Sequence, residues 1–132
     1  MIFVVYSSPV TKNTWKLACS IRDAIDPDIE VRMIDDDYPE EPTILFVPSY
    51  GGNSSRLVPP PVVKYLNEWG GGRDNVVGVV AAGNRNFGSM FCAGGIRVAQ
   101  KLGVPLLGMA ELAGQPNELP TIIESVKNIC HS

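Results

Sequence analysis

The sequence predicts an α/β fold in which a five-stranded parallel sheet lies between two layers of helices. Apolar, β-favouring runs alternate with segments of helical periodicity five times along the 132 residues. The run 76–80 has no polar alternation, as is typical of a strand covered on both faces of a parallel sheet. We therefore expect one domain, residues 1–132, with right-handed crossovers and the strand order 2-1-3-4-5.

The first half of the chain is predicted to hold three strands and one helix. Strand 2–6 leads into a helix that Asn13 or Thr14 can cap and that ends at Asp26-Pro27. Run 29–34 alternates apolar and charged residues, which indicates an edge strand, and run 43–48 is a buried strand. The apolar residues of the helix recur at helical spacing and should face the core: Trp15, Leu17, Ala18, Ile21, Ala24 and Ile25.

The second half continues the alternation. A helix begins at Pro59-Pro60-Pro61 and ends at glycines 70–72, and strand 76–80 opens into a polar loop. Small residues 93–95 predict a helix packed closely on the sheet and ending at Gly103. A fifth strand over 104–110 and a final helix over 119–130 complete the fold. The inward residues of the helix after the prolines are expected to be Val62, Val63, Tyr65 and Leu66.

Composition narrows the class of protein. The net charge is −3, with 11 basic against 14 acidic residues, which argues against a nucleic-acid partner. The apolar run 1–6 is too short for a signal sequence and no membrane span is present, so we expect a cytoplasmic protein without a membrane partner. Three widely spaced cysteines fit reduced thiols.

Three polar loops follow strands and are candidate binding elements. The loop 7–14 would leave amide donors at the positive end of a helix dipole, which is a physical site for a phosphate. The loops 49–57 and 83–88 contain glycines that allow close approach to a flat ligand, and Tyr50 offers an aromatic face. Taken by itself, loop 7–14 is also compatible with helix capping alone. Loop 49–57 by itself is also compatible with a surface loop that binds no ligand.

Several reaction classes are excluded by missing residues. Segment 83–88 resembles half of a Walker A motif, but Ser89-Met90 stands where Lys-Ser/Thr is needed. The only histidine is His131, so no histidine-based triad or zinc site can be assembled. The acidic run Asp35-Asp36-Asp37 is interpreted as a solvated loop, Cys92 as a buried thiol, and Trp15 as packing. A flavin, which carries its own redox chemistry, suits a site so poor in titratable groups.

The loops also carry a more specific pattern. Three segments stand out: Val47-Pro48-Ser49-Tyr50-Gly51-Gly52, then Gly83-Asn84-Arg85-Asn86-Phe87-Gly88, then Val104-Pro105-Leu106-Leu107 with Glu111-Leu112-Ala113-Gly114. In these segments, and in order over nearly the whole chain, the sequence resembles the NrdI family of flavodoxin-like proteins, which serve class Ib ribonucleotide reductase.

The resemblance implies a flavodoxin-like three-layer sandwich that binds FMN. It implies a redox partner rather than an enzyme with its own small-molecule substrate, fed by an unknown flavin reductant. Family members reduce dioxygen to an oxidant, described as superoxide, and deliver it to the dimanganese site of the reductase small subunit, where a tyrosyl radical forms. Carried over by position, the phosphate residues are Ser8, Thr11, Asn13 and Thr14, and the residues around the flavin ring are Ser49, Tyr50, Gly51, Gly52, Asn84, Asn86, Phe87 and Gly88.

The chain departs from the family pattern at Pro9 and Lys12. Pro9 loses one amide donor, whereas Lys12 adds a positive charge that we expect beside the phosphate. Two alternatives stay open: a short-chain flavodoxin that carries electrons between reductases, and a flavin-free binding module of the same fold.

Overall fold

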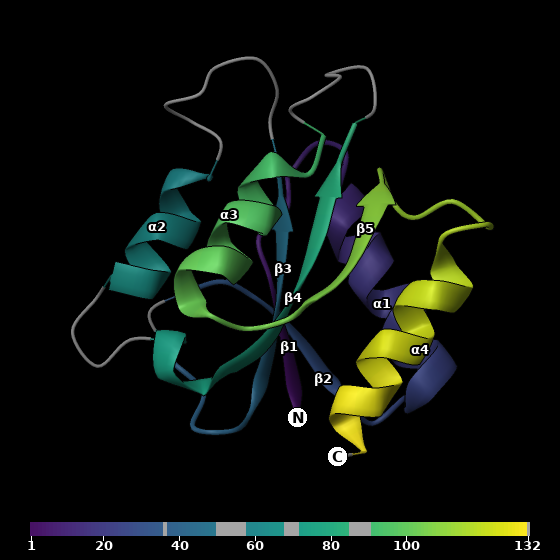
Figure 1. Cartoon of the computed structure of the whole chain (residues 1–132), viewed down its shortest axis with the longest axis horizontal. Coiled ribbons are helices and arrows are strands. Elements are labelled where there is room, and N and C mark those ends of the chain that lie inside the picture. The colour runs from purple at the N-terminus through teal and green to yellow at the C-terminus, as the bar shows by residue number, and fades with distance from the viewer. Residues whose placement is uncertain (36, 50–57, 68–71, 85–90, 132) are drawn as a thin grey trace.

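The computed structural model describes residues 1–35, 37–49, 58–67, 72–84 and 91–131. Within these ranges it contains a five-stranded parallel sheet of order β2-β1-β3-β4-β5, which confirms the predicted topology (Figure 1). The strands are β1 (Ile2–Val5), β2 (Glu30–Met33), β3 (Thr43–Pro48), β4 (Val76–Gly83) and β5 (Leu106–Glu111). The helices are α1 (Asn13–Ile25), α2 (Pro60–Asn67), α3 (Ala93–Leu102) and α4 (Leu119–Cys130), and a 3₁₀ turn, η2 (Gly72–Asn75), precedes β4.

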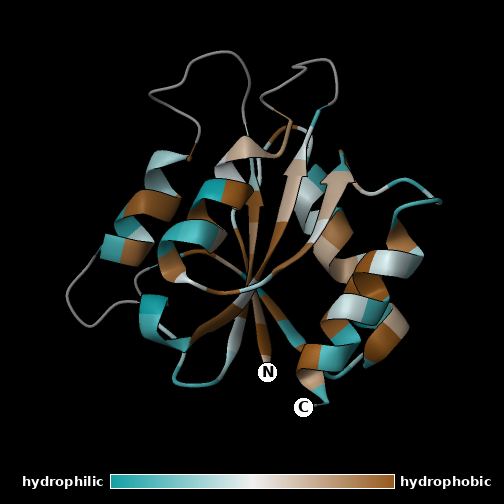
Figure 2. Cartoon of the chain, in the orientation of Figure 1, coloured by the Kyte–Doolittle hydropathy of each residue, from teal (hydrophilic) through white to brown (hydrophobic). Residues whose placement is uncertain are grey.

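The helices form two layers. Helices α1 and α4 cover one face of the sheet and α2 and α3 cover the other (Figure 1). Phe3, Phe46 and Ile21 belong to the core on the α1/α4 side, and Val4, Leu45 and Val62 to the core on the α2/α3 side. The central strands are apolar on both faces for this reason, while the helices turn hydrophilic residues outward (Figure 2).

The two edge strands differ from the central ones. All six residues of β3 are buried, whereas β2 lies at the sheet edge as predicted and exposes Glu30 and Met33. The strict alternation does not hold, because the apolar Met33 is exposed while the charged Arg32 is half-buried. At the far edge, β5 begins at Leu106, two residues later than predicted, and its register with β4 shifts between Val79 and Val80. The expected order therefore holds, while the exact start of β5 depends on an irregularity of pairing.

Helix α3 packs closely on β4, as its small residues predict. Gly94 and Gly95 are buried, and a Cβ on Gly95 would collide with the Cβ of Ala81 and lie 2.8 Å from its Cα. Any side chain at position 95 would push the helix off the sheet. The helix ends before Gly103, again as predicted.

Three apolar or capping predictions are wrong. Val63 is 40% exposed because the buried stripe of α2 runs through Val62, Tyr65 and Leu66. Ala24 is exposed because the core-facing side of α1 ends on Ile25 instead. Neither Asn13 nor Thr14 caps α1; the N-cap position is Lys12, which makes no side-chain capping bond.

Other expectations are met. Asp35 and Asp37 are exposed, in agreement with a solvated loop, and Cys92 is fully buried. Trp15 is half-buried against the core. None of the helices in the described ranges has the length and apolar character that crossing a membrane would require.

Candidate binding site at the carboxyl edge of the sheet

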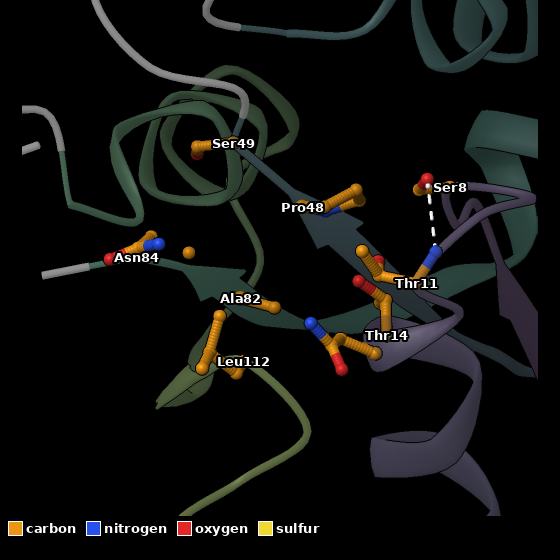
Figure 3. Close-up of a pocket in the computed structure, with 10 residues that line it drawn as sticks. Ser8, Thr11, Thr14, Pro48, Ser49, Ala82, Asn84 and Leu112 are labelled. Atoms are coloured by element: carbon orange, nitrogen blue, oxygen red, sulfur yellow. Dashed lines mark hydrogen bonds between the residues drawn. The ribbon is translucent and has the colours of Figure 1, made fainter. Parts of the chain in front are cut away.

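The carboxyl edge of the sheet holds a pocket between neighbouring strands whose helices leave to opposite faces. Strands β1 and β3 pair directly, yet α1 and α2 lie on opposite sides, which opens a crevice at their carboxyl ends. A pocket of about 160 Å³ lies there (Figure 3). Four rim segments line it: Ser8, Thr11, Asn13 and Thr14; Pro48 and Ser49; Ala82, Gly83 and Asn84; and Leu112.

The loop after β1 forms the polar end of this pocket. The Ser8 hydroxyl accepts from the backbone N–H groups of Val10, at 3.2 Å, and Thr11, at 3.5 Å. Lys12 N–H donates to the Ser8 carbonyl at 3.0 Å, and Lys12 itself takes a left-handed conformation with φ of 55°. Ser8 thereby folds the loop into a turn that brings Thr11 to the pocket (Figure 3). Asn13 also lines the pocket.

The start of α1 is capped by a residue of the loop that follows β1. The buried Ser7 hydroxyl accepts from Trp15 N–H at 3.3 Å, across eight residues of sequence, which satisfies one donor of the first turn. Among the described residues, none accepts from the N–H groups of Asn13 and Thr14. Because Asn13 and Thr14 both line the pocket, two amide donors at the positive end of a thirteen-residue helix lie beside it and suit an anion.

Ser49 joins three elements at the opposite wall. Its hydroxyl accepts from Gly94 N–H at 2.8 Å, and its own N–H donates to the Ala82 carbonyl at 2.9 Å. Ser49 is 5% exposed, so both bonds are shielded from water. Ser49 lines the pocket, and it also fixes the end of β3 against β4 and the first turn of α3.

The pocket contains no acid–base group among its described lining residues, which are hydroxyl, amide and apolar types. The groups with raised pKa values lie elsewhere: burial raises the pKa of Tyr65 to about 12 and also raises the pKa values of Cys19 and Cys130. A side-chain hydrogen bond to Glu30 raises the pKa of Arg32. Within the described ranges, no cluster of His, Cys, Asp and Glu could hold a metal. The arrangement suits a ligand that is held by hydrogen bonds and brings its own reactivity.

The predicted site residues fall into three groups. Ser8, Thr11, Asn13, Thr14, Ser49 and Asn84 all line one pocket, while Lys12 is exposed on the same loop. Tyr50, Gly51, Gly52, Asn86, Phe87 and Gly88 lie outside the described residues. Four lining residues were not predicted: Pro48, Ala82, Gly83 and Leu112. Pro48, Gly83 and Leu112 lie within the motifs quoted above and Ala82 directly precedes one of them, but only the converging strand ends show that they share a pocket.

A doubly wound sheet of this order, with a pocket at its switch point and amide donors at the start of α1, defines a flavodoxin-like protein. Solved structures of similar architecture bear this out. A short-chain flavodoxin associated with a bacterial microcompartment superposes with a TM-score of 0.65 at 13% identity, covering 98% of this chain and 96% of that one. Megasphaera elsdenii flavodoxin gives 0.62 at 20% identity, covering 97% and 99%.

The sequence places the chain more narrowly: it belongs to the NrdI flavodoxin-like family, whose family model matches residues 4–124. The protein NrdI of Erwinia tasmaniensis is 36% identical over 132 aligned residues, covering 96% of this chain and 92% of that protein. Its counterpart in Beutenbergia cavernae is 37% identical, with 93% and 89% covered. The Enterobacter protein is 44% identical over 88 residues, a match that spans 66% of this chain and 64% of that protein. Membership and fold together imply a flavin-binding protein.

Proposed function

We propose that this protein binds FMN and activates the small subunit of a class Ib ribonucleotide reductase by reducing dioxygen to superoxide, which is delivered to the dimanganese site. The observation that carries the proposal is the pocket at the switch point of a chain of the NrdI family. Among the residues that the structure describes, this pocket has amide donors without an acceptor at one end and no titratable lining group. Bound FMN would take electrons from a separate reductant and give them one at a time to dioxygen.

The polar end of the pocket suits the phosphate. The N–H groups of Asn13 and Thr14 would donate to phosphate oxygens, and the hydroxyls of Thr11 and Thr14 lie on the same side of the pocket. The Ser8 hydroxyl oxygen already accepts two hydrogen bonds within the turn, so Ser8 would contribute its O–H as a donor to the phosphate. The Lys12 charge would add attraction from the exposed side of the loop.

The remaining walls suit the ring. Pro48, Ala82 and Gly83 provide an apolar floor, with Ser49 and Asn84 at its border. We propose from the sequence that Tyr50, Gly51, Gly52, Asn86, Phe87 and Gly88 complete the ring site. Dioxygen and the reductase subunit would approach on this side, and the role would place the protein in the cytoplasm with its partner.

The test begins with purified protein and added FMN. Stoichiometric binding, seen as a change in flavin absorbance and quenched fluorescence, is expected. The protein is then reduced without oxygen and mixed with manganese-loaded small subunit and dioxygen, and the tyrosyl radical is measured by electron paramagnetic resonance. Radical formation that requires both reduced FMN and this protein supports the proposal, and failure to bind added FMN refutes it, leaving a flavin-free binding module.

A second candidate function is single-electron transfer between reductases. The superposition on a short-chain flavodoxin over nearly the full length of both chains favours it. An electron carrier of this kind would reoxidise slowly in oxygen and give no radical above the level obtained with free reduced FMN. The radical yield therefore separates the two redox functions.

A further inference from the structure

Leu112 combines two features that are individually unfavourable. Its backbone is left-handed, with φ of 57°, a conformation that residues other than glycine seldom adopt. Its apolar side chain is nevertheless 40% exposed, so burial in the core does not compensate the backbone conformation. The side chain lines the pocket beside Ala82, away from Ser8 and Thr11 (Figure 3). Strain of this kind, held at a pocket, is a reason to look for a ligand contact.

The surrounding chain holds Leu112 in this position. Its N–H donates to the Gly83 carbonyl at 2.8 Å, which ties it to the end of β4. The Glu118 carboxylate accepts from the N–H groups of both Glu111 and Gln115 at 2.9 Å, closing the loop behind it. Gly114 follows with φ of 96°, and a Cβ there would lie 2.9 Å from Leu17 of α1. The loop is therefore fixed on both sides of Leu112 and packed against α1.

A left-handed backbone and an exposed apolar side chain each occur elsewhere in the described chain, but not together. Lys12 and Cys92 are also left-handed, but Lys12 is a polar surface residue and Cys92 is fully buried. Leu106 and Met109 of β5 are exposed to a similar degree, 37% and 43%, but do not line the pocket. Among the described residues, only Leu112 joins a left-handed backbone, an exposed apolar side chain and a place in the pocket wall.

We propose that Leu112 is a specificity-determining residue of the pocket, whose side chain contacts the apolar ring system of the ligand while the loop 8–14 holds its phosphate. This inference rests on the proposed flavin function and deepens it. Contact with the ring would remove the exposed apolar surface of Leu112 from water. The pocket would then favour ligands with an aromatic ring over the phosphate group alone.

The experiment compares FMN, riboflavin and inorganic phosphate as ligands of the apoprotein. Leu112→Ala should weaken FMN and riboflavin binding by the same factor, roughly ten-fold, because the lost contact is with the ring that both share. The inhibition constant of inorganic phosphate against FMN should not change. Thr11→Ala should instead weaken FMN and phosphate and leave riboflavin unaffected. Leu112→Met, which keeps an apolar side chain, should bind like the wild type.

Two further variants separate contact from folding. Leu106→Ala removes the same atoms from a similarly exposed leucine of β5 and should leave all three affinities unchanged. Leu112→Gly removes the contact and also the backbone strain, so apoprotein Tm should rise by roughly 3 °C while flavin affinity falls. Unchanged flavin affinity in both Leu112→Ala and Leu112→Gly overturns the inference while leaving the proposed function intact. Absence of FMN binding by the wild type refutes the proposed function, and the inference with it.

Discussion

Ser49 connects the end of β3 to the first turn of α3 through one buried hydrogen bond, and Ser49→Ala removes it. The bond joins the Ser49 hydroxyl to Gly94 N–H at 2.8 Å, with Ser49 5% exposed and Gly94 buried. Truncation would leave a buried N–H of the first helical turn without an acceptor. Such a group costs about 1–3 kcal/mol, and loss of a helix-capping oxygen alone costs a similar amount.

We therefore expect Ser49→Ala to lower the free energy of unfolding of the apoprotein by about 2 kcal/mol. For a domain of this size the corresponding loss in Tm is roughly 7 °C. The assay is urea unfolding followed by circular dichroism, and an unchanged m-value would show that the unfolded ensemble is the same.

The matched control is Ser20→Ala on the exposed side of α1, which should stay within about 0.5 kcal/mol of the wild type. If Ser49→Ala is as stable as this control, the hydroxyl does not hold α3 to the sheet and the reasoning is refuted.

Three other predictions follow from single contacts. Gly95→Ala should destabilise the fold by at least about 2 kcal/mol in urea, since its Cβ would collide with Ala81; wild-type stability would contradict the close packing of α3. Lys12→Gln should weaken FMN binding about three-fold at low salt and not at high salt, while Lys16→Gln, one turn further along, should have no effect; a salt-independent loss would argue against a charge effect. Tyr65→Phe should stabilise the protein by about 1 kcal/mol at neutral pH, because the buried Tyr65 hydroxyl has no hydrogen-bond partner within the described part of the chain. Burial raises the pKa of Tyr65 to about 12, so the unfolded chain ionises first; the wild type should lose stability relative to Tyr65→Phe as pH rises above 10, and parallel pH profiles would contradict this.

Much of the fold was predictable because hydrophobic runs and turn residues are local signals. The bounds of α4, Leu119–Cys130, agree with the prediction from its apolar spacing, and the buried run 43–48 is β3. The errors in the predicted core arose where an apolar residue of a helix lies outside the face that packs on the sheet. Val63 is as apolar as Val62, yet only Val62 faces the sheet. The periodicity of a short helix defines a stripe only within about one residue.

The site was predictable in its polar half. Hydroxyl and amide residues directly after a strand and before a helix indicate an anion site by local chemistry, and Ser8, Thr11, Asn13 and Thr14 do line the pocket. The apolar half was missed because Pro48, Ala82 and Leu112 resemble ordinary core or loop residues. Leu112 reaches the pocket through a left-handed backbone and a hydrogen bond to Gly83, and no sequence pattern predicts φ of 57° for a leucine.

The alternation of strands and helices follows from hydrophobic period along the chain, and the family from short motifs. The strand order was inferred from the fold class that this alternation indicates. The contacts between distant residues are visible only in the folded protein: Ser7 caps α1 across eight positions, Ser49 holds α3 across 45, and Leu112 lines the pocket. Such pairings depend on how the layers pack, because a hydrogen bond or an apolar contact needs distance and direction that residue type does not encode.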